Sequence, residues 1–393
     1  MKILIANLGS TSFKYRLFEM SDTDAALLAK GGFERVTEYT PCIEEMLETL
    51  VGEGHLLSGE DLDAVGFKTV LGKDLSGCVK ADERVLEALD GFKEVAPAHN
   101  PAYVEGIRCF QKMLPEVTRV ALFETAFYQW VSLAASTYAI PKAWRDLGIR
   151  RYGFHGASHK FIAERTAELL GNDAVADRVR RLYVDGPGEY TGDPVRVISC
   201  HLGGSSSVTG IQNGVSIGTS MGFSPQSGLP QNNRVGDLDS MAIPYVCKML
   251  GITVEEAERQ LNKESGMLGL SGVSNDARDI EDAAAAGNAD AQHALDVQID
   301  SIRHWAGSFF FKMGGAEVIS FTAGIGENDS ALRSAVCAGL EGFGVKIDEV
   351  ANAQTIRGKE GVISTPDSTI KVVVIPANEE LVIAREVYRN VQS

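Results

Sequence analysis

The sequence predicts an α/β protein made of two similar halves, and three observations support this prediction. Strand-like and helix-like segments alternate along the chain, as is typical of α/β layers. The chain has 393 residues, and a domain usually takes ~100 to 200 residues, so about two domains are expected. Hairpin-like segments recur half a chain apart, because Leu8-Gly9-Ser10 aligns with Leu202-Gly203-Gly204 at an offset of 194 residues. This recurrence indicates a duplication, although two hairpins also arise by chance.

The first half begins with a hairpin, because an apolar run is followed by a Gly/Ser/Thr turn and then by a segment of alternating apolar and polar residues. After it, apolar spacing distinguishes helices from strands, and a segment dense in Gly, Pro and Asp indicates an inserted surface loop. The predicted elements are hairpin strands at 3–6 and 13–18, helices over 43–50, 101–114 and 158–170, strands over 64–70 and 119–123, and the loop over 185–194.

The second half repeats this start and then becomes richer in helix. Its hairpin again consists of an apolar strand, a small-residue turn and a return strand. The predicted elements are hairpin strands at 197–200 and 208–214, helical stretches over 254–261 and 282–313, strands over 318–322 and 370–375, and helices over 331–340 and 379–391.

The composition argues for a globular protein that binds neither nucleic acid nor membranes. The 37 Lys and Arg residues and the 53 Asp and Glu residues give a formal net charge of −16, which repels polyphosphate backbones and anionic lipids. No stretch approaches the ~18 uncharged apolar residues of a membrane helix. The six cysteines lack CxxC spacing, so neither a zinc site nor a disulfide framework is expected. The N-terminus lacks signal-peptide features, which predicts a cytoplasmic protein.

The turn of the first hairpin is rich in hydrogen-bond donors. Its amide, hydroxyl and ammonium groups can hold phosphate oxygens, and its glycine lets the backbone approach a ligand. It is not a Walker P-loop, because GxxxxGK[ST] is absent and a strand follows. An ordinary polar turn also fits the pattern. The candidate phosphate-binding residues here are Asn7, Ser10, Ser12 and Lys14.

The turn of the second hairpin offers similar donors from the other half of the chain. Its candidate residues are His201, Gly203 and Gly204. Two such turns facing one another would hold a polyphosphate between the domains.

A third small-residue motif ends a buried strand and precedes a helix. It contains Gly324, Gly326 and Asn328, so glycine backbone and a helix N-terminus would meet a nucleotide there. A tight strand-to-helix turn without a ligand explains the motif equally well.

Three further residues are candidates for catalysis or ligand binding. His155 stands between an aromatic residue and a glycine just ahead of a helix, where structural histidines are also common. Arg234 lies in a loop rich in Gly, Pro and Asn and suits bidentate binding of oxyanions, unless it is a solvated surface arginine. Glu379 follows a buried strand, where its carboxylate would bind Mg²⁺ or would only favour the first turn of the last helix.

Seven motifs in this order and spacing resemble the acetate kinase family, within the superfamily of sugar kinases and actin. They are NLGSTSFKY, YGFHGASH, HLGGSSS, TSMGFSP, SNDARDI, FTAGIGEN and IPANEELVIARE. The resemblance implies two duplicated actin-like, ribonuclease H-like domains with a central cleft that closes on ATP and a short carboxylate, in a homodimer. The implied reaction is reversible transfer of the γ-phosphoryl group of MgATP to acetate, giving acetyl phosphate and ADP.

The same resemblance implies the domain boundaries. The N-terminal domain would span residues 1–148 and be completed by the C-terminal helix at about 382–393. The C-terminal domain, residues 149–381, would bind the nucleotide.

The family pattern also implies a role for each candidate residue. The catalytic set is His155, Arg234, Lys68, Glu124 and Asn7, in which His155 and Arg234 bring positive charge to the transferring phosphoryl group. The carboxylate-binding set is Lys68, His99, Val70, Phe154 and Pro225. The nucleotide-binding set is Ser10, Ser12, Lys14, His201, Gly203, Gly204, Asp276, Arg278, Gly324, Gly326 and Asn328. Asn7 and Glu379 would hold Mg²⁺, with Mn²⁺ as the alternative.

Five positions depart from the family pattern. Arginine is usual at Lys68, aspartate at Glu124, asparagine at Gly204, an aromatic residue at Ala277 and aspartate at Gly218. An ammonium acts as a point charge, whereas a guanidinium grips an oxyanion with two parallel hydrogen bonds, so the lysine bears on the choice of acid. The alternatives are a kinase for propionate or another carboxylate, a kinase that uses pyrophosphate, and a catalytically weak ATP-binding paralogue acting as a sensor.

Overall fold

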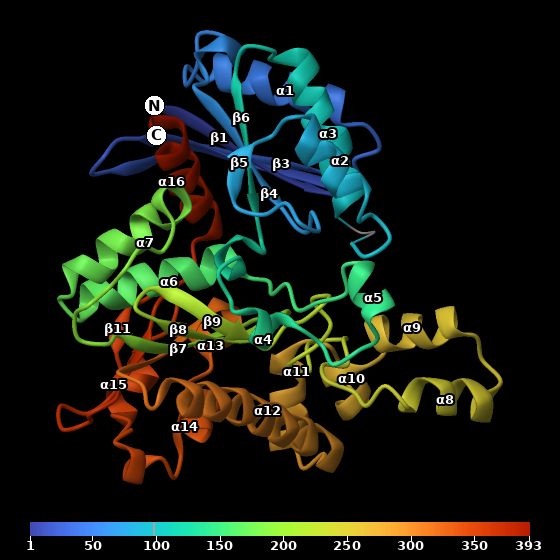
Figure 1. Cartoon of the computed structure of the whole chain (residues 1–393), viewed down its shortest axis with the longest axis vertical. Coiled ribbons are helices and arrows are strands. Elements are labelled where there is room, and N and C mark those ends of the chain that lie inside the picture. Colours follow the sequence, from blue (N-terminus) through green and yellow to red (C-terminus); the bar gives the residue numbers. More distant parts are fainter. Residues whose placement is uncertain (97–98) are drawn as a thin grey trace.

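Two six-stranded β-sheets organise the computed structural model, which describes residues 1–96 and 99–393 (Figure 1). The first sheet has the strand order β3-β2-β1-β4-β6-β5, and the second has the order β11-β12-β10-β7-β8-β9. The strands are β1 (Lys2–Gly9), β2 (Ser12–Met20), β3 (Ala25–Glu34), β4 (Ala64–Thr69), β5 (Cys78–Lys80), β6 (Thr118–Phe123), β7 (Arg196–Leu202), β8 (Ser206–Gln212), β9 (Val215–Thr219), β10 (Val318–Thr322), β11 (Gly361–Val362) and β12 (Lys371–Val374).

The second sheet repeats the connectivity of the first. β1 pairs antiparallel with β2 and parallel with β4, just as β7 pairs antiparallel with β8 and parallel with β10. β4 and β6 are parallel, as are β10 and β12, and each sheet ends in a short antiparallel strand, β5 or β11. The duplication expected from the two hairpins is therefore confirmed, and so is the mixed α/β class.

Helices cover both faces of each sheet, which buries the apolar side chains that alternate along the strands. The helices are α1 (Tyr39–Gly52), α2 (Glu83–Asp90), α3 (Asn100–Met113), α4 (Leu133–Ser136), α5 (Lys142–Asp146), α6 (Gly156–Leu169), α7 (Asp173–Asp185), α8 (Ala242–Leu250), α9 (Val254–Lys263), α10 (Gly266–Ser271), α11 (Ala277–Ala285), α12 (Ala289–Met313), α13 (Ala323–Asn328), α14 (Ser330–Cys337), α15 (Glu349–Gln354) and α16 (Glu379–Gln392).

The first sheet is enclosed between α3 and α16, which come from distant parts of the chain (Figure 1). Successive residues of β4 face opposite sides, so the ring of Phe67 meets Phe110 of α3. On the other side, a Cβ at Gly66 would contact Val387 and Ile383 of α16. The C-terminal helix is thus part of the N-terminal hydrophobic core.

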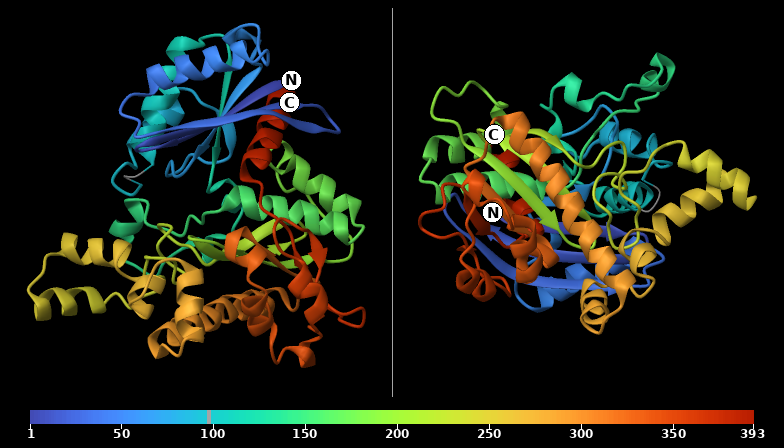
Figure 2. Two further views of the ribbon diagram at one scale, coloured as in Figure 1. Left: turned by 180° about the vertical axis from the view of Figure 1, so that it is seen from behind. Right: turned by 90° about the horizontal axis from the view of Figure 1, so that it is seen from below.

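The second sheet lies between α6 and α7 on one face and α12 on the other. Along β7, Val197 joins the core that contains Ile162 of α6, and the next residue, Ile198, joins the core that contains Phe309 of α12. Two helices leave this arrangement: α8 and α9 project from the body as an arm (Figure 2), and no side chain of α8 is buried.

The helical stretch expected over 282–313 is divided into α11 and α12. Gly287 has a φ of +93°, in the left-handed region that glycine tolerates. The side chain of Asn288 then accepts a hydrogen bond from the backbone N–H of Asp290 at 3.0 Å, which caps a new helix. The edge strand β3 was not expected, because its exposed position leaves no fully buried side chain to mark it.

The structure also bears on two expectations drawn from composition. In the part of the chain that the structure describes, no helix has both the length and the apolar character needed to cross a bilayer. All six cysteines are free thiols, as their spacing indicates.

Truncating Ile383 to alanine should destabilise the first half of the molecule. The side chain is 1% exposed and packs in the N-terminal core, and removing a buried isoleucine side chain usually costs ~2–5 kcal/mol. We expect the first urea-unfolding transition, followed by circular dichroism, to shift to lower denaturant. Leu57→Ala is the control, because Leu57 is 89% exposed. Equal midpoints for Ile383→Ala and the unsubstituted protein would contradict the packing of α16 on the first sheet.

Candidate active site

Three charged residues from separate elements meet where the two sheets face one another. Lys68 stands near the end of β4, Glu124 follows β6, and Glu379 opens α16. Lys68 Nζ lies 2.9 Å from Glu124 Oε1 and 2.6 Å from Glu379 Oε2. The neighbouring strands β4 and β6 are parallel, so their carboxyl ends deliver Lys68 and Glu124 to the same edge. The C-terminal helix supplies the third charge.

The ammonium of Lys68 stabilises both carboxylates, whereas burial and the charge of Glu379 raise the pKa of Glu124. Burial alone would lower the pKa of Lys68, but the carboxylates of Glu124 and Glu379 raise it, so the ammonium stays protonated. The positive charge of Lys68 lowers the pKa of Glu379. Two of the three ammonium donors face carboxylates, which leaves one for a ligand.

Oxygen donors of the kind that divalent cations bind lie at this place, around the ammonium of Lys68. Glu124 and Glu379 converge on one point, and Asn7 on the end of β1 accepts a hydrogen bond from Tyr103 Oη at 3.1 Å. Among the described residues, no group of three or more His, Cys, Asp or Glu side chains forms a complete metal site. Mg²⁺ usually binds one or two carboxylates together with substrate phosphates and waters, so a complete protein site is not required.

His155 is presented by a strained turn at the start of α6. It has a φ of +96°, in the left-handed region that non-glycine residues rarely adopt. The next residue, Gly156, donates its backbone N–H to the carbonyl of Glu124 at 2.9 Å, and a Cβ at Gly156 would lie only 2.4 Å from that oxygen. The imidazole is therefore fixed beside the acidic cluster.

Buried serine hydroxyls hold His155 in a network that the sequence did not reveal. His155 Nδ1 lies 2.8 Å from Ser207 Oγ, which is also 2.9 Å from His159 Nε2. His159 Nδ1 in turn lies 2.8 Å from Ser199 Oγ. Because Ser207 occupies Nδ1 of His155, the other ring nitrogen is left for a ligand.

The surroundings of His155 favour the neutral imidazole. Burial lowers its pKa well below the usual value, and the nearby His201, His159, Lys68 and Arg234 lower it further. The ring of His201 lies 4.2 Å from that of His155. Burial is thus the main cause that disfavours a positive charge on this imidazole, and the neighbouring histidines and cations add to it.

Arg234 is positioned by a residue that the sequence analysis did not single out. Gln231 is 1% exposed, and its side-chain oxygen accepts hydrogen bonds from Ser205 Oγ at 2.7 Å and Arg234 Nη1 at 3.4 Å. Its side-chain nitrogen donates to the carbonyl of Pro225 at 2.5 Å. Gln231 thus connects the arginine loop to the turn of the second hairpin. The only sequence signal was an amide among small residues in that loop.

The nucleotide-binding candidates of the second half largely come together. A cavity of about 630 Å³ has a volume typical of small-molecule sites. A Cβ at Gly324 would meet no atom within 4 Å, so this glycine faces open space. Asp276 caps α11 and pairs with Arg278 at 2.6 Å. Predicted residues that line the cavity are Gly203, Gly204, Asp276, Arg278, Gly324 and Asn328, together with Ala277.

Other nucleotide candidates lie outside this cavity. Gly326 is buried in α13, and His201 is buried with its Nδ1 2.8 Å from Ser158 Oγ. Ser10 and Ser12 lie on the turn of the first hairpin, in the other half. Lys14 is 65% exposed and lies 3.7 Å from Glu34.

The carboxylate-binding candidates surround a small apolar cluster. Phe154 is buried in it, Val70 packs on its edge, and Pro225 lies in the arginine loop nearby. His99 precedes α3, and its pKa is lowered by partial burial and by the charges of Arg234 and Lys68. Val70 and Phe154 thus share one apolar cluster, and the charges of Arg234 and Lys68 act on His99.

Two duplicated α/β halves, with acidic, cationic and imidazole groups between them and a nucleotide-sized cavity beside them, define a kinase with two actin-like domains. The sequence profile of the Acetokinase family matches residues 32–385. An acetate kinase from Geobacillus kaustophilus (strain HTA426) is 40% identical over 412 aligned positions, which cover 99% of this chain and 98% of the relative. The chain belongs to the acetokinase family, whose enzymes are carboxylate kinases that use ATP and a divalent metal.

Solved structures agree with this assignment. Acetate kinase from Porphyromonas gingivalis is 33% identical, with a TM-score of 0.88 and coverage of 100% of both chains. A propionate kinase from Francisella tularensis subsp. tularensis SCHU S4 is 31% identical, with a TM-score of 0.85 and coverage of 98% of both chains. The whole fold is shared with both proteins.

Replacing Gly324 by valine should block the nucleotide cavity without unfolding the protein. The new side chain would enter open space, where a Cβ meets no atom within 4 Å. We expect ATP binding, measured by calorimetry, to weaken about tenfold or more, which corresponds to ~1.4 kcal/mol. Gly342→Val is the matched control, since it also meets open space but is not among the residues that line the cavity. An unchanged Kd for ATP in Gly324→Val would exclude this cavity as the site.

The buried histidines should make the protein less stable as the pH falls. Burial lowers the pKa of His155 and His159, and that of His201 to about 4, whereas an unfolded histidine titrates near ~6.5. Below pH 6.5 the unfolded chain binds protons that the folded chain does not, so stability is lost by about 1.4 kcal/mol per pH unit for each imidazole.

The measurement is urea unfolding at pH 7, 6 and 5. His201→Asn should show a shallower dependence on pH, and His293→Asn, on the exposed face of α12, should keep the original slope. Identical slopes in all three proteins would contradict the neutral state of the buried cluster.

Proposed function

We propose that this enzyme transfers the γ-phosphoryl group of ATP to acetate, reversibly, and forms acetyl phosphate and ADP. The observation that carries the proposal is the contact of Lys68 with Glu124 and Glu379, near enough to His155 for Lys68 and Arg234 to lower the pKa of that imidazole, in a chain that also holds a nucleotide-sized cavity. The acetate kinase relative from Geobacillus kaustophilus, at 40% identity over nearly the whole chain, supports acetate as the acceptor.

The chemistry asks little of a general base. A carboxylate is already an adequate nucleophile, so catalysis rests on alignment of the reactants and on positive charge around the equatorial oxygens. Arg234 supplies a permanent guanidinium, and the free ring nitrogen of His155 supplies a hydrogen bond to the group in transfer. Water is excluded on one side by the apolar cluster that contains Phe154.

We assign the acetate methyl group to the apolar cluster and its carboxylate to the cationic side. Val70, Phe154 and Pro225 would contact the methyl group, and His99 and the remaining donor of Lys68 would orient the carboxylate. Mg²⁺, held by Glu124 and Glu379 with Asn7 nearby, would neutralise charge on the nucleotide phosphates when bound. Mn²⁺ would serve in the same place.

The nucleotide would lie in the second half and reach toward the first. The adenosine would occupy the cavity of Gly324, Ala277 and Asp276, with the phosphates along the turn at Gly203. Ser10, Ser12 and Lys14 of the first turn would meet the phosphates on closure. His201 and Gly326 would support the phosphate turn and the adenosine site from behind.

We further propose two domains and a homodimer. The first domain would be residues 1–148 completed by about 382–393, since α16 packs in the first core, and the second would be residues 149–381. Exposed apolar side chains on the arm, such as Met241, Tyr245 and Met249, would be covered by a second copy. Six free cysteines agree with a reducing, cytoplasmic location.

A propionate kinase is the second candidate. The observation that favours it is the propionate kinase from Francisella tularensis, which shares the whole fold at 31% identity. Lys68, where the family pattern has arginine, and Leu71 in the apolar cluster would set the room available for a longer acid.

The test is a hydroxylamine assay with acetate, propionate and butyrate, each with ATP, GTP or pyrophosphate as donor and Mg²⁺ or Mn²⁺ as metal. We expect ferric-reactive hydroxamate from ATP and acetate, with at least tenfold higher kcat/KM than for propionate, because one misplaced methylene is worth ~1–3 kcal/mol. His155→Asn is the control that excludes a contaminating kinase.

Each other outcome selects an alternative. Preference for propionate would replace acetate as the substrate, and activity with pyrophosphate would replace ATP as the donor. Nucleotide binding without hydroxamate from any acid would favour the sensor and overturn the proposed reaction.

A further inference from the structure

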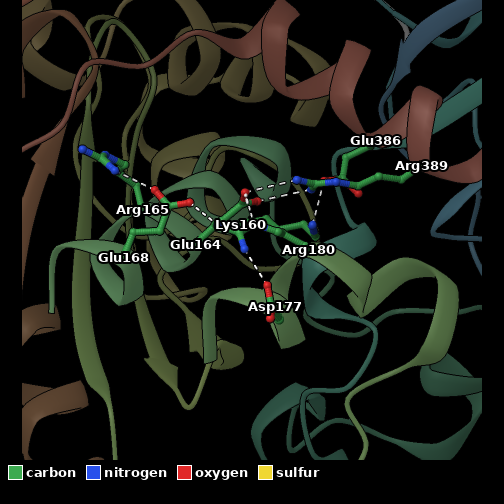
Figure 3. Close-up of polar contacts among 8 residues, drawn as sticks. All are labelled: Lys160, Glu164, Arg165, Glu168, Asp177, Arg180, Glu386 and Arg389. Atoms are coloured by element: carbon green, nitrogen blue, oxygen red, sulfur yellow. Dashed lines mark hydrogen bonds and ion pairs between the residues drawn. The ribbon is translucent and has the colours of Figure 1, made fainter. Parts of the chain in front are cut away.

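A network of ion pairs joins helices of the two halves at a distance from the reacting groups. Helices α6 and α7 pack with α16, and charged side chains from all three converge between them (Figure 3). The members are Lys160, Glu164, Arg165 and Glu168 of α6, Asp177 and Arg180 of α7, and Glu386 and Arg389 of α16.

The centre of the network is a fully buried pair. Lys160 Nζ lies 2.7 Å from Glu386 Oε1, and the two side chains are 1% and 3% exposed. Arg389 Nη1 lies 2.6 Å from the same carboxylate oxygen, and Arg389 Nη2 lies 3.1 Å from Glu164 Oε1. The ammonium of Lys160 is also 4.8 Å from the ring centre of Tyr183. Protein groups therefore enclose the pair on several sides.

Stability alone is a poor explanation for this pair. Taking two charges out of water is costly, and a buried ion pair can often be replaced by apolar residues without loss of stability. A buried pair does, however, tie two elements to one relative placement, because a shift of either helix would leave a charge unpaired. The pair of Lys160 and Glu386 ties helix α6 to helix α16.

Each of the two helices begins at a residue of the candidate active site. His155 is the N-cap of α6, and Glu379, which contacts Lys68, is the first residue of α16. Helix α6 packs on β7 and β10 of the second sheet, whereas α16 packs on β1, β2 and β4 of the first. Lys160 and Glu386 stand five and seven residues into their helices, about 8 and 10 Å from those ends at 1.5 Å per residue.

We propose that Lys160 and Glu386 are positioning residues for phosphoryl transfer: their buried contact sets the place of His155 on one half relative to Glu379 and Lys68 on the other. The inference rests on the proposed function, because it assigns those three residues to one reaction. Neither member of the pair touches the reacting groups. They act through the helices that carry them.

The first test replaces the pair by Lys160→Met together with Glu386→Met, which keeps the volume and removes the directional contact. We expect kcat in the hydroxylamine assay to fall about tenfold or more, since small misplacements of reacting groups are costly. The Kd for adenosine, which would reach only the cavity and not the first half, should stay within about twofold, because the cavity is lined by the second half alone. Lys160→Arg, which keeps the cation, should recover much of the kcat that Lys160→Met loses.

The matched control removes a pair that does not join the halves. Lys142 and Asp146 form an exposed pair within α5, 78% and 60% exposed. The double variant Lys142→Met/Asp146→Met should leave kcat, KM and stability unchanged, because exposed pairs of this kind contribute little.

A second readout needs no activity. Spin labels at Leu57→Cys and Phe311→Cys, which are 89% and 88% exposed in opposite halves, report the distance between the halves. The partly exposed Cys42, Cys109 and Cys247 are changed to serine, and labelled chains are diluted in unlabelled ones so that pairs within one chain dominate. The distance distribution should broaden in the Lys160→Met/Glu386→Met protein and stay narrow in the α5 control.

The two readouts separate the inference from the proposed function. Wild-type kcat and an unchanged distribution in the methionine pair would overturn the positioning role. If the unsubstituted enzyme acts on no acid but the distribution broadens in the variant, the pair still sets the placement and the proposed reaction is wrong. If the methionine pair does not fold, Glu386→Gln, which keeps the shape and loses the charge, takes its place. A kcat and a distribution equal to those of the wild type in that protein would equally overturn the inference.

Discussion

The packing of α16 on the first sheet is the constraint on which the active site depends. The helix follows β12 of the second sheet, yet Ile383 and Val387 are buried in the first core. Its first residue, Glu379, is thereby brought to Lys68, which lies 311 positions earlier in the chain. Apolar burial thus holds a charged residue in place, and undocking the helix would expose its apolar face and remove Glu379 in one event. The packing that stabilises the first half therefore also assembles the site.

The structure shows which residues contact three of the positions that depart from the family pattern. Lysine is shorter than arginine, and glutamate is one methylene longer than aspartate. In the structure the carboxylate of Glu124 meets the ammonium of Lys68 at 2.9 Å, so the two departures contact each other. Gly218 lies beside Phe309. A Cβ at position 218 would be 3.1 Å from the ring of Phe309, so the glycine leaves room for that ring. The neighbours of these three positions, Lys68, Glu124 and Gly218, are visible only in the fold.

The parts of the molecule that follow local rules could be predicted from the sequence. The hairpins, the turn glycines and the alternation of strands and helices depend on neighbouring residues, and the repeat of β1–β2 in β7–β8 was visible for that reason. Contacts between distant segments could not be predicted, such as Lys160 with Glu386, 226 positions apart. One member of the serine–histidine network could have been noticed in the sequence. Ser199 falls at a buried strand position, where a polar group needs a hydrogen-bond partner.

The charges of the site are divided between the two halves, and this division explains why placement of the halves matters. On the first half, Glu124 and Glu379 outnumber Lys68, so that centre attracts a cation. On the second half, Arg234 contacts the neutral amide of Gln231, so its charge is available to an anion. Burial and the nearby cations lower the pKa of His155, and the negative charge of a phosphoryl group would raise it. An arriving anion therefore favours protonation of His155. The added positive charge can act on the transferring group only if the acidic centre of Glu124 and Glu379 is at the right distance. The relative position of α6 and α16 sets that distance.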